Sequence, residues 1–320
     1  MARYLGRRVV SGILTLLVVI LLTFFLVRLA PGNPAAFLGG LTASPEYLAQ
    51  LTERMGLNKP LVEQLGTYFG DLARGDLGFS LTWNQPVNDV IVGRLPATIL
   101  LMSVSFAASF LIGVGLGVLA SRIPYGRVDN AVTITSLIGY SVPQFWVGMI
   151  LLLVFGLYLG IFPVQGMVTT GLDLEGFDAA LDVLRHLAMP ALALGITELA
   201  VIVRITRASM LEVIEADFVR TARSKGIGER QVLVRHALRN ALLPLITLGA
   251  LRLRSLFAGA ILVEAIFGWP GIGTLTVNAM FERDYPMILG ITIWAAILTV
   301  IINFVTDIAY SFVDPRISAT

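Results

Sequence analysis

Residues 9–27 read VVSGILTLLVVILLTFFLV, a stretch of 19 positions without a charged side chain. A helix needs about 20 consecutive apolar residues to cross a hydrocarbon core roughly 30 Å thick. Arg3, Arg7 and Arg8 precede the stretch, which is also typical of a secretory signal peptide. The stretch is longer than a signal core, however, and the RLAPG that follows does not resemble a small-residue cleavage site. It therefore predicts a retained transmembrane helix.

The composition agrees with a membrane protein. Of the 320 residues, 56% are hydrophobic and 14% are charged, and the mean hydropathy is +0.83. Soluble domains carry roughly 25% charged residues, so a water-soluble globule is excluded. The absence of cysteine excludes disulfides, thiol catalysis and cysteine-ligated metal sites. A net charge of +2 is too small to indicate nucleic acid as a partner.

Five further segments have the length and apolar character of membrane-spanning helices. They are residues 95–121, 130–160, 186–203, 241–263 and 285–306. Pro143 predicts a kink in the second of these, because proline has no backbone N–H to donate. The sequence thus predicts an all-α membrane protein with six transmembrane helices.

The basic residues predict the orientation, because cytoplasmic loops carry an excess of Lys and Arg. With a cytoplasmic N-terminus, the inner segments hold 14 of the 23 basic residues and the outer segments hold seven. These inner segments are residues 1–8, 122–129, 204–240 and 311–320. We therefore expect both termini to be cytoplasmic.

This orientation divides the chain into four parts. Residues 1–29 form an N-terminal transmembrane helix, and residues 30–94 form an extracytoplasmic loop with short helices. Residues 95–310 form a core of five transmembrane helices that includes a cytoplasmic loop at 211–240, and residues 311–320 form a cytoplasmic tail.

The cytoplasmic loop has its own helical pattern. Residues 211–244 read LEVIEADFVRTARSKGIGERQVLVRHALRNALLP. This predicts a helix over 211–224, a break at Gly226 and Gly228, and a second helix over 229–242. Gly226 is expected to end the first helix in the left-handed conformation that glycine adopts at little cost.

An apolar face with a basic rim lies on the first of these helices. Phe218, Val219 and Ala222 make up the face, and the flanking basic residues are Arg220, Arg223 and Lys225. A short helix of this kind suits a groove on another protein. The alternative is a solvated basic loop that only fixes the orientation in the membrane.

Several motifs in the chain resemble the permease subunits of the ABC importers for dipeptides, oligopeptides and nickel. The EAA motif of that family resembles Glu215-Ala216, Gly226 and Leu243-Pro244 here. Further matching segments run along the chain: RLAPGNP at 28–34, RGDLGFSL at 74–81, RLPAT at 94–98, SVPQFW at 141–146, VEAIFGWPGIG at 263–273, RDYP at 283–286 and DPRI at 314–317. The resemblance therefore covers essentially the whole chain.

The resemblance implies a fold and a set of partners. The fold would be that of a type I ABC importer permease (MetI-like) in the cytoplasmic membrane of a prokaryote. The partners would be a homologous second permease, two ATPase subunits, an extracytoplasmic substrate-binding protein and the lipid bilayer. The substrates would be di- or oligopeptides, and relatives that carry nickel, glutathione or oligosaccharides give the alternatives.

The same resemblance implies that residues 215–226 are the coupling helix, which docks on an ATPase subunit. The implied coupling residues are Glu215, Ala216, Asp217, Phe218, Val219, Arg220, Ala222, Arg223, Lys225 and Gly226. ATP and Mg would be used by the partner subunits, with no cofactor bound by this chain. The sequence supports this, because neither of its two lysines, Lys59 and Lys225, follows a glycine, so a GxxxxGK phosphate loop is absent.

Three ionisable residues fall inside expected spans: Glu198, Arg252 and Arg254. Such residues are costly in a membrane and indicate a functional site. Glu198 and Arg252 are both expected near the midplane, where they would form either a structural ion pair or part of the translocation path. Arg252 and Arg254 lie about 200° apart on a helix, so both cannot face the path.

Two other functional classes agree less well with the sequence. A self-sufficient secondary transporter would use intramembrane carboxylates in two repeated halves, and only Glu198 and Asp307 are available. A membrane-embedded enzyme is not supported, because the sequence has neither an HExxH nor a GxSxG motif. His186 and His236 are fifty residues apart, so they do not support a metalloprotease either.

Overall fold

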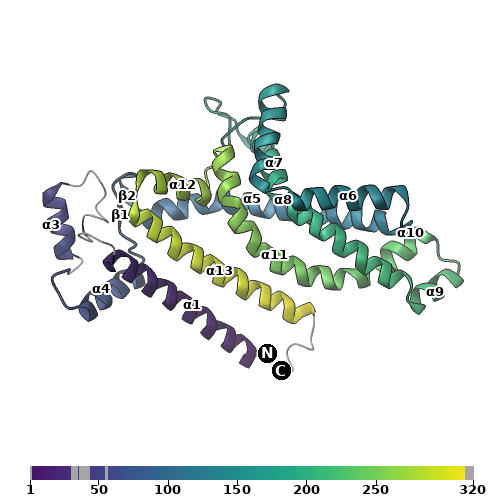
Figure 1. Ribbon diagram of the computed structural model, residues 1–320, viewed down its shortest axis with the longest axis horizontal. Coiled ribbons are helices and arrows are strands. Elements are labelled where there is room, and N and C mark those ends of the chain that lie inside the picture. Colours follow the sequence, from purple (N-terminus) through teal and green to yellow (C-terminus); the bar gives the residue numbers. More distant parts are fainter. Residues whose placement is uncertain (1, 30–34, 36–43, 55–56, 314–320) are drawn as a thin grey trace. The chain divides into compact units, whose positions relative to one another are not determined.

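The computed structural model describes residues 2–29, 35, 44–54 and 57–313. Within these, the side chains of residues 2–5, 27–29, 243, 246–259 and 306–313 lie outside the described part. The chain is mainly helical (Figure 1) and divides into two compact units. One unit comprises the chain up to Thr98 together with Pro270–Val305, and the other comprises Ile99–Trp269. One boundary falls inside a long helix, so the expected parts at 30–94 and 95–310 remain a prediction.

The first unit combines long apolar helices with short outer elements. Its elements are α1 (Ala2–Leu29), α3 (Pro45–Arg54), α4 (Leu61–Ala73), β1 (Phe79–Ser80), β2 (Gln85–Pro86), the start of α5 (Val87–Ser121), α12 (Ile272–Glu282) and α13 (Tyr285–Val313). α1 and α13 lie side by side (Figure 1), and a Cβ atom on Gly12 would stand 2.8 Å from Cγ1 of Val300. The strands β1 and β2 form an antiparallel pair.

Polar side chains join the outer elements of this unit. Asp284 accepts the backbone N–H of Met287 at 3.1 Å, which satisfies a free donor in the first turn of α13, and it also accepts the hydroxyl of Ser80. The hydroxyl oxygen of Thr98 accepts the N–H of Ile272 at 2.8 Å at the start of α12. These bonds fix the helix ends around the β-hairpin.

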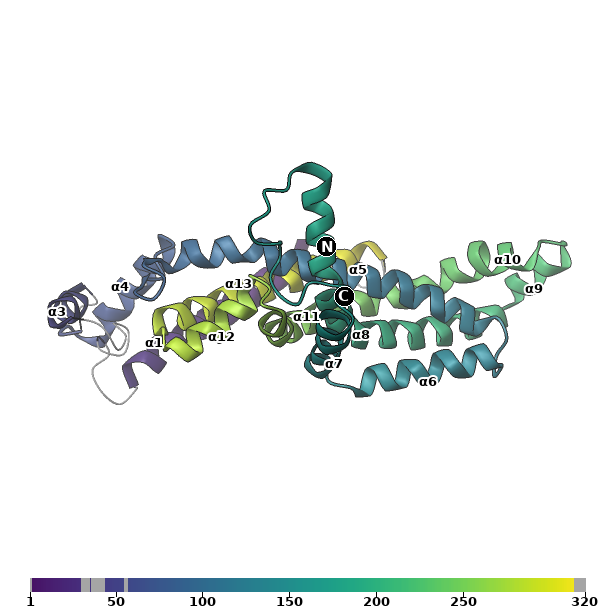
Figure 2. The same ribbon diagram turned by 90° about the horizontal axis from the view of Figure 1, so that it is seen from above.

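The second unit is a helical assembly built around one long helix. Its elements are the rest of α5, α6 (Arg127–Ser141), α7 (Gln144–Leu151), η1 (Leu152–Tyr158), α8 (Gly176–Ile214), α9 (Asp217–Ser224), α10 (Glu229–Gln231), η2 (Val232–Ala237) and α11 (Leu238–Phe267). α6 runs alongside α8 in both views (Figures 1 and 2). The chain bends by 103° between α6 and the helix that follows, which confirms the kink expected at Pro143.

α5 and α8 pack closely because α5 carries a small residue at every fourth position. Residues at this spacing lie on one face of a helix. They are Ser105, Ser109, Gly113 and Gly117. The Ser105 hydroxyl donates to the carbonyl of Ala191, and the Ser109 hydroxyl donates to that of Gly195, both at 2.9 Å. A Cβ atom on Gly117 would lie 2.4 Å from Cβ of Thr206. The contacts advance together along both helices, so α5 and α8 are parallel.

Within the described residues, four helices are long and apolar enough to cross a membrane, and the number rises to six if each sharply bent helix pair is one span. The four are Gly6–Leu26, Val87–Ser121, Gly176–Ile214 and Tyr285–Val305. The expected fifth span falls within α11, largely on side chains outside the described part. The six-span count therefore remains a prediction.

The helix that contains the expected fourth span is longer than that span. The span was predicted over residues 186–203, and α8 covers Gly176–Ile214. Residues 204–214 contain no glycine or proline, and arginine favours a helix, so the charges of Arg204 and Arg207 do not interrupt it. The helix simply extends beyond its apolar part.

Replacing Gly117 by valine should destabilise the protein by about 1–3 kcal/mol, because the added carbons overpack the contact with Thr206. Thermal unfolding of the detergent-purified protein would measure this as a lower Tm. Gly115→Val is the matched control, since no atom lies within 4 Å of its added Cβ. Equal Tm values for the two variants would contradict close packing of α5 on α8.

Candidate functional site

The candidate site is the coupling segment, residues 215–226, between α8 and α10. The chain does not continue as one helix here, because Glu215 ends α8 and Ala216 adopts an extended conformation with ψ 148°. α9 then begins at Asp217. The expected helix over 211–224 is therefore broken in two.

The break changes the place of the acidic residues. Asp217, and not Glu215 of the EAA motif, is the acidic residue of the first turn of α9. A negative charge in that turn is favourable, because backbone N–H groups make the helix N-terminus partly positive. The Glu215 side chain is exposed and makes no ion pair among the described residues.

The expected apolar face of α9 is divided between two directions. Val219 and Ala222 are buried and pack with Val232 of η2, whereas Phe218 remains 45% exposed. Successive helical residues point about 100° apart, so Phe218 and Val219 cannot share the same contact. Val219 and Ala222 thus fasten α9 to the following helix, and Phe218 is left for solvent or a partner.

The C-terminus of α9 is closed by a Schellman motif. Gly226 has φ +76°, which confirms its expected left-handed conformation. Its N–H donates to the carbonyl of Arg223 at 2.9 Å, and the N–H of Ile227 donates to that of Ala222 at 3.4 Å. Ile227 also packs on the cluster of Val219, Ala222 and Val232. The motif therefore gives the turn a defined shape.

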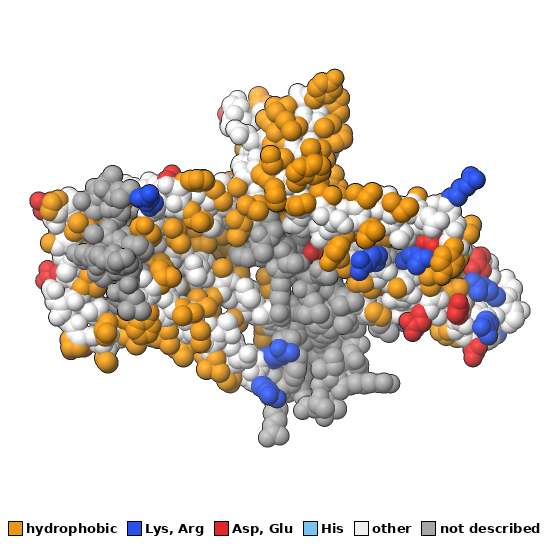
Figure 3. Space-filling view, in the orientation of Figure 1, with side chains coloured by type: hydrophobic (Ala, Val, Ile, Leu, Met, Phe, Trp, Pro, Cys, Tyr) orange, Lys and Arg blue, Asp and Glu red, His pale blue; other side chains and the backbone are white. Residues whose placement is uncertain are grey.

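An ion pair holds the two arms of this turn together. The Arg223 guanidinium binds both carboxylate oxygens of Glu229, with N–O distances of 3.1 and 2.7 Å. These hydrogen bonds lower the pKa of Glu229 and raise the pKa of Arg223. Of the expected basic rim, Arg220 and Lys225 are exposed, and Arg220 forms an ion pair with Asp217 at 3.6 Å. Figure 3 shows charged side chains gathered over α9 and α10.

The candidate path residues are only partly described. Glu198 is 1% exposed in the middle of α8. Arg252 and Arg254 belong to α11, and their side chains lie outside the described residues, so an ion pair with Glu198 stays untested. The sequence reasoning missed Glu264, which is fully buried in α11. The sequence does point to this residue, because it is an acidic side chain within the otherwise apolar segment VEAIF.

Comparison with known proteins identifies the family. Residues 113–319 match the profile described as "Binding-protein-dependent transport system inner membrane component", and residues 1–102 match the N-terminal profile of the same systems. The chain belongs to this family. As an ABC importer permease, it is a multi-pass membrane protein and a transport subunit rather than a catalytic enzyme.

Two curated relatives match the permease over nearly its full length. The oligopeptide transport system permease protein AppB of Bacillus subtilis is 41% identical over 318 residues, with 99% of each chain covered. The di/tripeptide transport system permease protein DppB of Pseudomonas aeruginosa is 42% identical over 334 residues, also with 99% of each chain covered.

A solved structure is similar in fold. An inward-facing conformation of the MetNI methionine ABC transporter contains a chain that matches with a TM-score of 0.55 and 19% identity. The match covers 70% of the permease and 96% of that chain. It supports the expected MetI-like fold.

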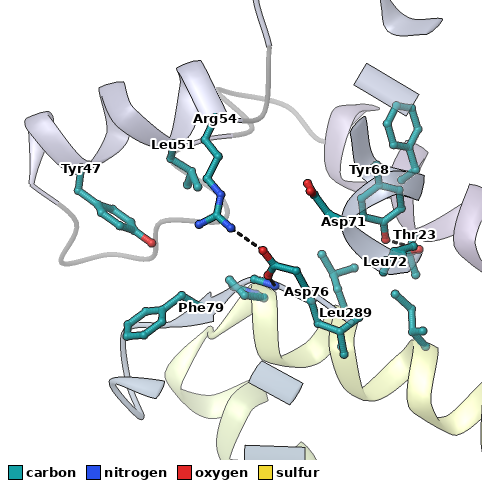
Figure 4. Close-up of a pocket in the computed structure, with 16 residues that line it drawn as sticks. Thr23, Tyr47, Leu51, Arg54, Tyr68, Asp71, Leu72, Asp76, Phe79 and Leu289 are labelled. Carbon is teal, nitrogen blue, oxygen red and sulfur yellow. Dashed lines mark hydrogen bonds and ion pairs between the residues drawn. The ribbon is translucent and has the colours of Figure 1, made fainter. Parts of the chain in front are cut away.

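A cavity of about 130 Å³ in the first unit of the permease is a second candidate. Figure 4 shows Arg54 reaching from α3 toward Asp76, with which it forms an ion pair, and the Tyr68 hydroxyl beside Thr23 at 3.1 Å. The polar groups named here bind one another, so the cavity is better explained as a packing gap where α1, α3 and α4 meet than as a binding site. Among the described residues, no three His, Asp or Glu side chains gather to hold a metal ion.

Replacing Glu229 by glutamine should loosen the turn after α9 at neutral pH. Because the pKa of Glu229 is lowered in the folded protein, the ion pair stabilises the turn fully at pH values above the usual titration range of glutamate. This stabilisation is lost as the pH falls through the pKa of Glu229 in the folded protein. Exposed pairs contribute about 0.2–1 kcal/mol, so the effect is local. Hydrogen exchange over residues 217–232 should be faster in the variant.

The pH dependence and a control complete this test. The difference from the unmodified protein should vanish once its own carboxyl group is protonated. Glu212→Gln removes an exposed acid of α8 for which no ion pair is formed among the described residues. Faster exchange in the Glu212 variant as well, or an effect of Glu229→Gln that persists in acid, would show that the pair is not responsible.

Proposed function

We propose that this protein is the transmembrane permease subunit of an ATP-driven, binding-protein-dependent importer of di- or oligopeptides. The observation that carries the proposal is the match to both family profiles together with full-length relatives that are named as peptide permeases. A homologous second permease completes the translocation path. A substrate-binding protein delivers the peptide from outside.

The proposed topology has six spans with cytoplasmic termini. α5 and α8 are parallel, so the bent segment between them must cross the membrane once in the opposite direction. α6 supports this, because it is antiparallel to α8: Asp129 meets Arg207, and Gly139 lies against Ile196. The excess of basic residues in the inner segments favours the cytoplasmic side for α9.

In the proposed mechanism, α9 docks on an ATPase subunit, and the coupling residues divide into two groups. Five exposed residues contact the ATPase: Glu215, Asp217, Phe218, Arg220 and Lys225. The other five shape the segment: Ala216, Val219, Ala222, Arg223 and Gly226. ATP with Mg is bound and hydrolysed by the partner subunits. Closure of those subunits moves α9, and α8 carries the movement into the membrane.

The proposed translocation path runs between the two permeases near the middle of the membrane. Glu198 lies on α8, the helix that α9 would move, and its burial makes it a candidate for lining the path or for holding the path in shape. Arg252 and Arg254 are proposed for the same region on α11. Uptake catalysed by the isolated chain without ATPase subunits would instead favour a secondary transporter.

Replacing Phe218 by alanine should weaken binding of the ATPase subunits, because an exposed aromatic on a short helix is a suitable anchor for a pocket. A loss of about 2 kcal/mol is expected, which is roughly thirtyfold in affinity. Copurification of the ATPase subunits after mild detergent extraction measures it. Phe177→Ala is the matched control, since Phe177 is 80% exposed at the opposite end of α8. Equal copurification of both variants would contradict docking through Phe218.

Replacing Gly226 by alanine should lower ATP-driven uptake, because a residue with a Cβ atom costs about 1 kcal/mol or more at φ +76°. No atom lies within 4 Å of the added Cβ, so the effect comes from the backbone alone. Gly228→Ala is the control, since Gly228 has φ −61°, which alanine accepts. Uptake into liposomes that contain the assembled importer should fall only for Gly226→Ala.

A further inference from the structure

Asp129 is a nearly fully buried carboxylate in the first turn of α6, with 1% of its side chain exposed. Arg207 of α8 binds both of its oxygens, with Nη2 at 2.6 Å from Oδ2 and Nε bonded to Oδ1. The backbone N–H of Tyr125 donates to Oδ2 at 2.7 Å. A buried charge is costly unless it is paired and hydrogen-bonded, and here both conditions are met. The pair is therefore a bidentate and directional link between α6 and α8, formed by residues 78 positions apart in the chain.

α7 is attached to α8 as well. The Gln144 amide, at the start of α7 just after the bend at Pro143, donates to the carbonyl of Leu194 at 3.0 Å. Between the two hydrogen-bonded sites, a Cβ atom on Gly139 would lie 3.3 Å from the side chain of Ile196, so α6 and α8 touch. The attachment points on α8, Leu194 and Arg207, are about 20 Å apart along the helix. The Asp129–Arg207 pair is thus the polar link between α6 itself and α8, at the end of α6 that is far from the bend.

The Asp129–Arg207 pair lies close to the coupling segment along α8. Arg207 precedes the last residue of α8, Ile214, by seven positions, or about 10 Å along the helix. Any displacement of α9 reaches the pair before it reaches the membrane interior. On the other side of the pair, α6 leads directly to the bend at Pro143 and to α7.

We propose that the Asp129–Arg207 pair makes α6 and α8 move as one body, so that a displacement of the coupling segment reaches the bend between α6 and α7. The inference rests on the proposed function. Arg207 and Asp129 are positioning residues: they contact neither substrate nor ATP, and they determine how much of the ATP-driven movement becomes transport. Without the link, α8 moves and α6 lags behind it.

The test compares transport with ATP hydrolysis in the intact importer, reconstituted in liposomes with its partner subunits. The variants are Asp129→Asn, Arg207→Met and the double variant. The double variant leaves no unpaired charge at this site, and its Asn side chain can still accept the N–H of Tyr125, so it should fold even if a single variant does not. Asp178→Asn, an exposed acid at the other end of α8, is the control.

We expect the double variant to retain a Tm near that of the unmodified importer, bind the ATPase subunits normally and hydrolyse ATP, yet move about fivefold less peptide per ATP hydrolysed. Asp129→Glu keeps a carboxylate beside Arg207 and should recover part of the ratio. The Asp178 variant should keep the full ratio. A pair that only stabilises the fold would behave differently, since the ratio would recover together with the Tm.

A double variant with a normal ratio of transport to hydrolysis therefore overturns the inference and leaves the proposed function intact. Absence of ATP-driven uptake in the unmodified importer overturns the proposed function itself. The two failures are distinguished by the unmodified importer, which is measured first.

Discussion

The close contact between α5 and α8 is the constraint on which the second unit depends. In a lipid bilayer there is no hydrophobic driving force between helices, because lipid tails are as apolar as the side chains. Helices therefore associate through close packing and interhelical hydrogen bonds. Ser105 and Ser109 supply such bonds to carbonyls of α8, and Gly113 and Gly117 let the backbones approach. This contact fixes the direction of α8, and through α8 it fixes where α6 and α9 attach.

The coupling segment combines an internally bonded half with an exposed half. Val219 and Ala222 pack on η2, and Gly226 and the Arg223–Glu229 pair close the turn, so α9 keeps its shape without a partner. In the proposed docking, the ATPase subunit would bind a preformed surface, which avoids the loss of conformational entropy that a flexible loop would suffer on binding. Phe218 can serve as an anchor because its neighbours hold the backbone in place.

Local features were predictable from the sequence, and long-range ones were not. Pro143 and Gly226 act through their own backbone chemistry, so the bend and the helix end could be predicted. The break at Glu215–Ala216 could not, because alanine and glutamate both favour helices and the break accompanies the packing of Val219 on Val232. The same reason hid the pair of Asp129 with Arg207, since nothing local relates residues 78 positions apart.

α8 is long enough to connect the two ends of the second unit. Its 39 residues extend over about 58 Å, well beyond the roughly 30 Å thickness of a hydrocarbon core. Near its start, Asp182 accepts the N–H and the hydroxyl of Thr169, each at 2.7 Å, and so holds the preceding loop. Near its other end, Arg207 holds α6, and α9 follows directly. A continuous helix with polar attachments at both ends transmits a displacement that separate short helices would absorb.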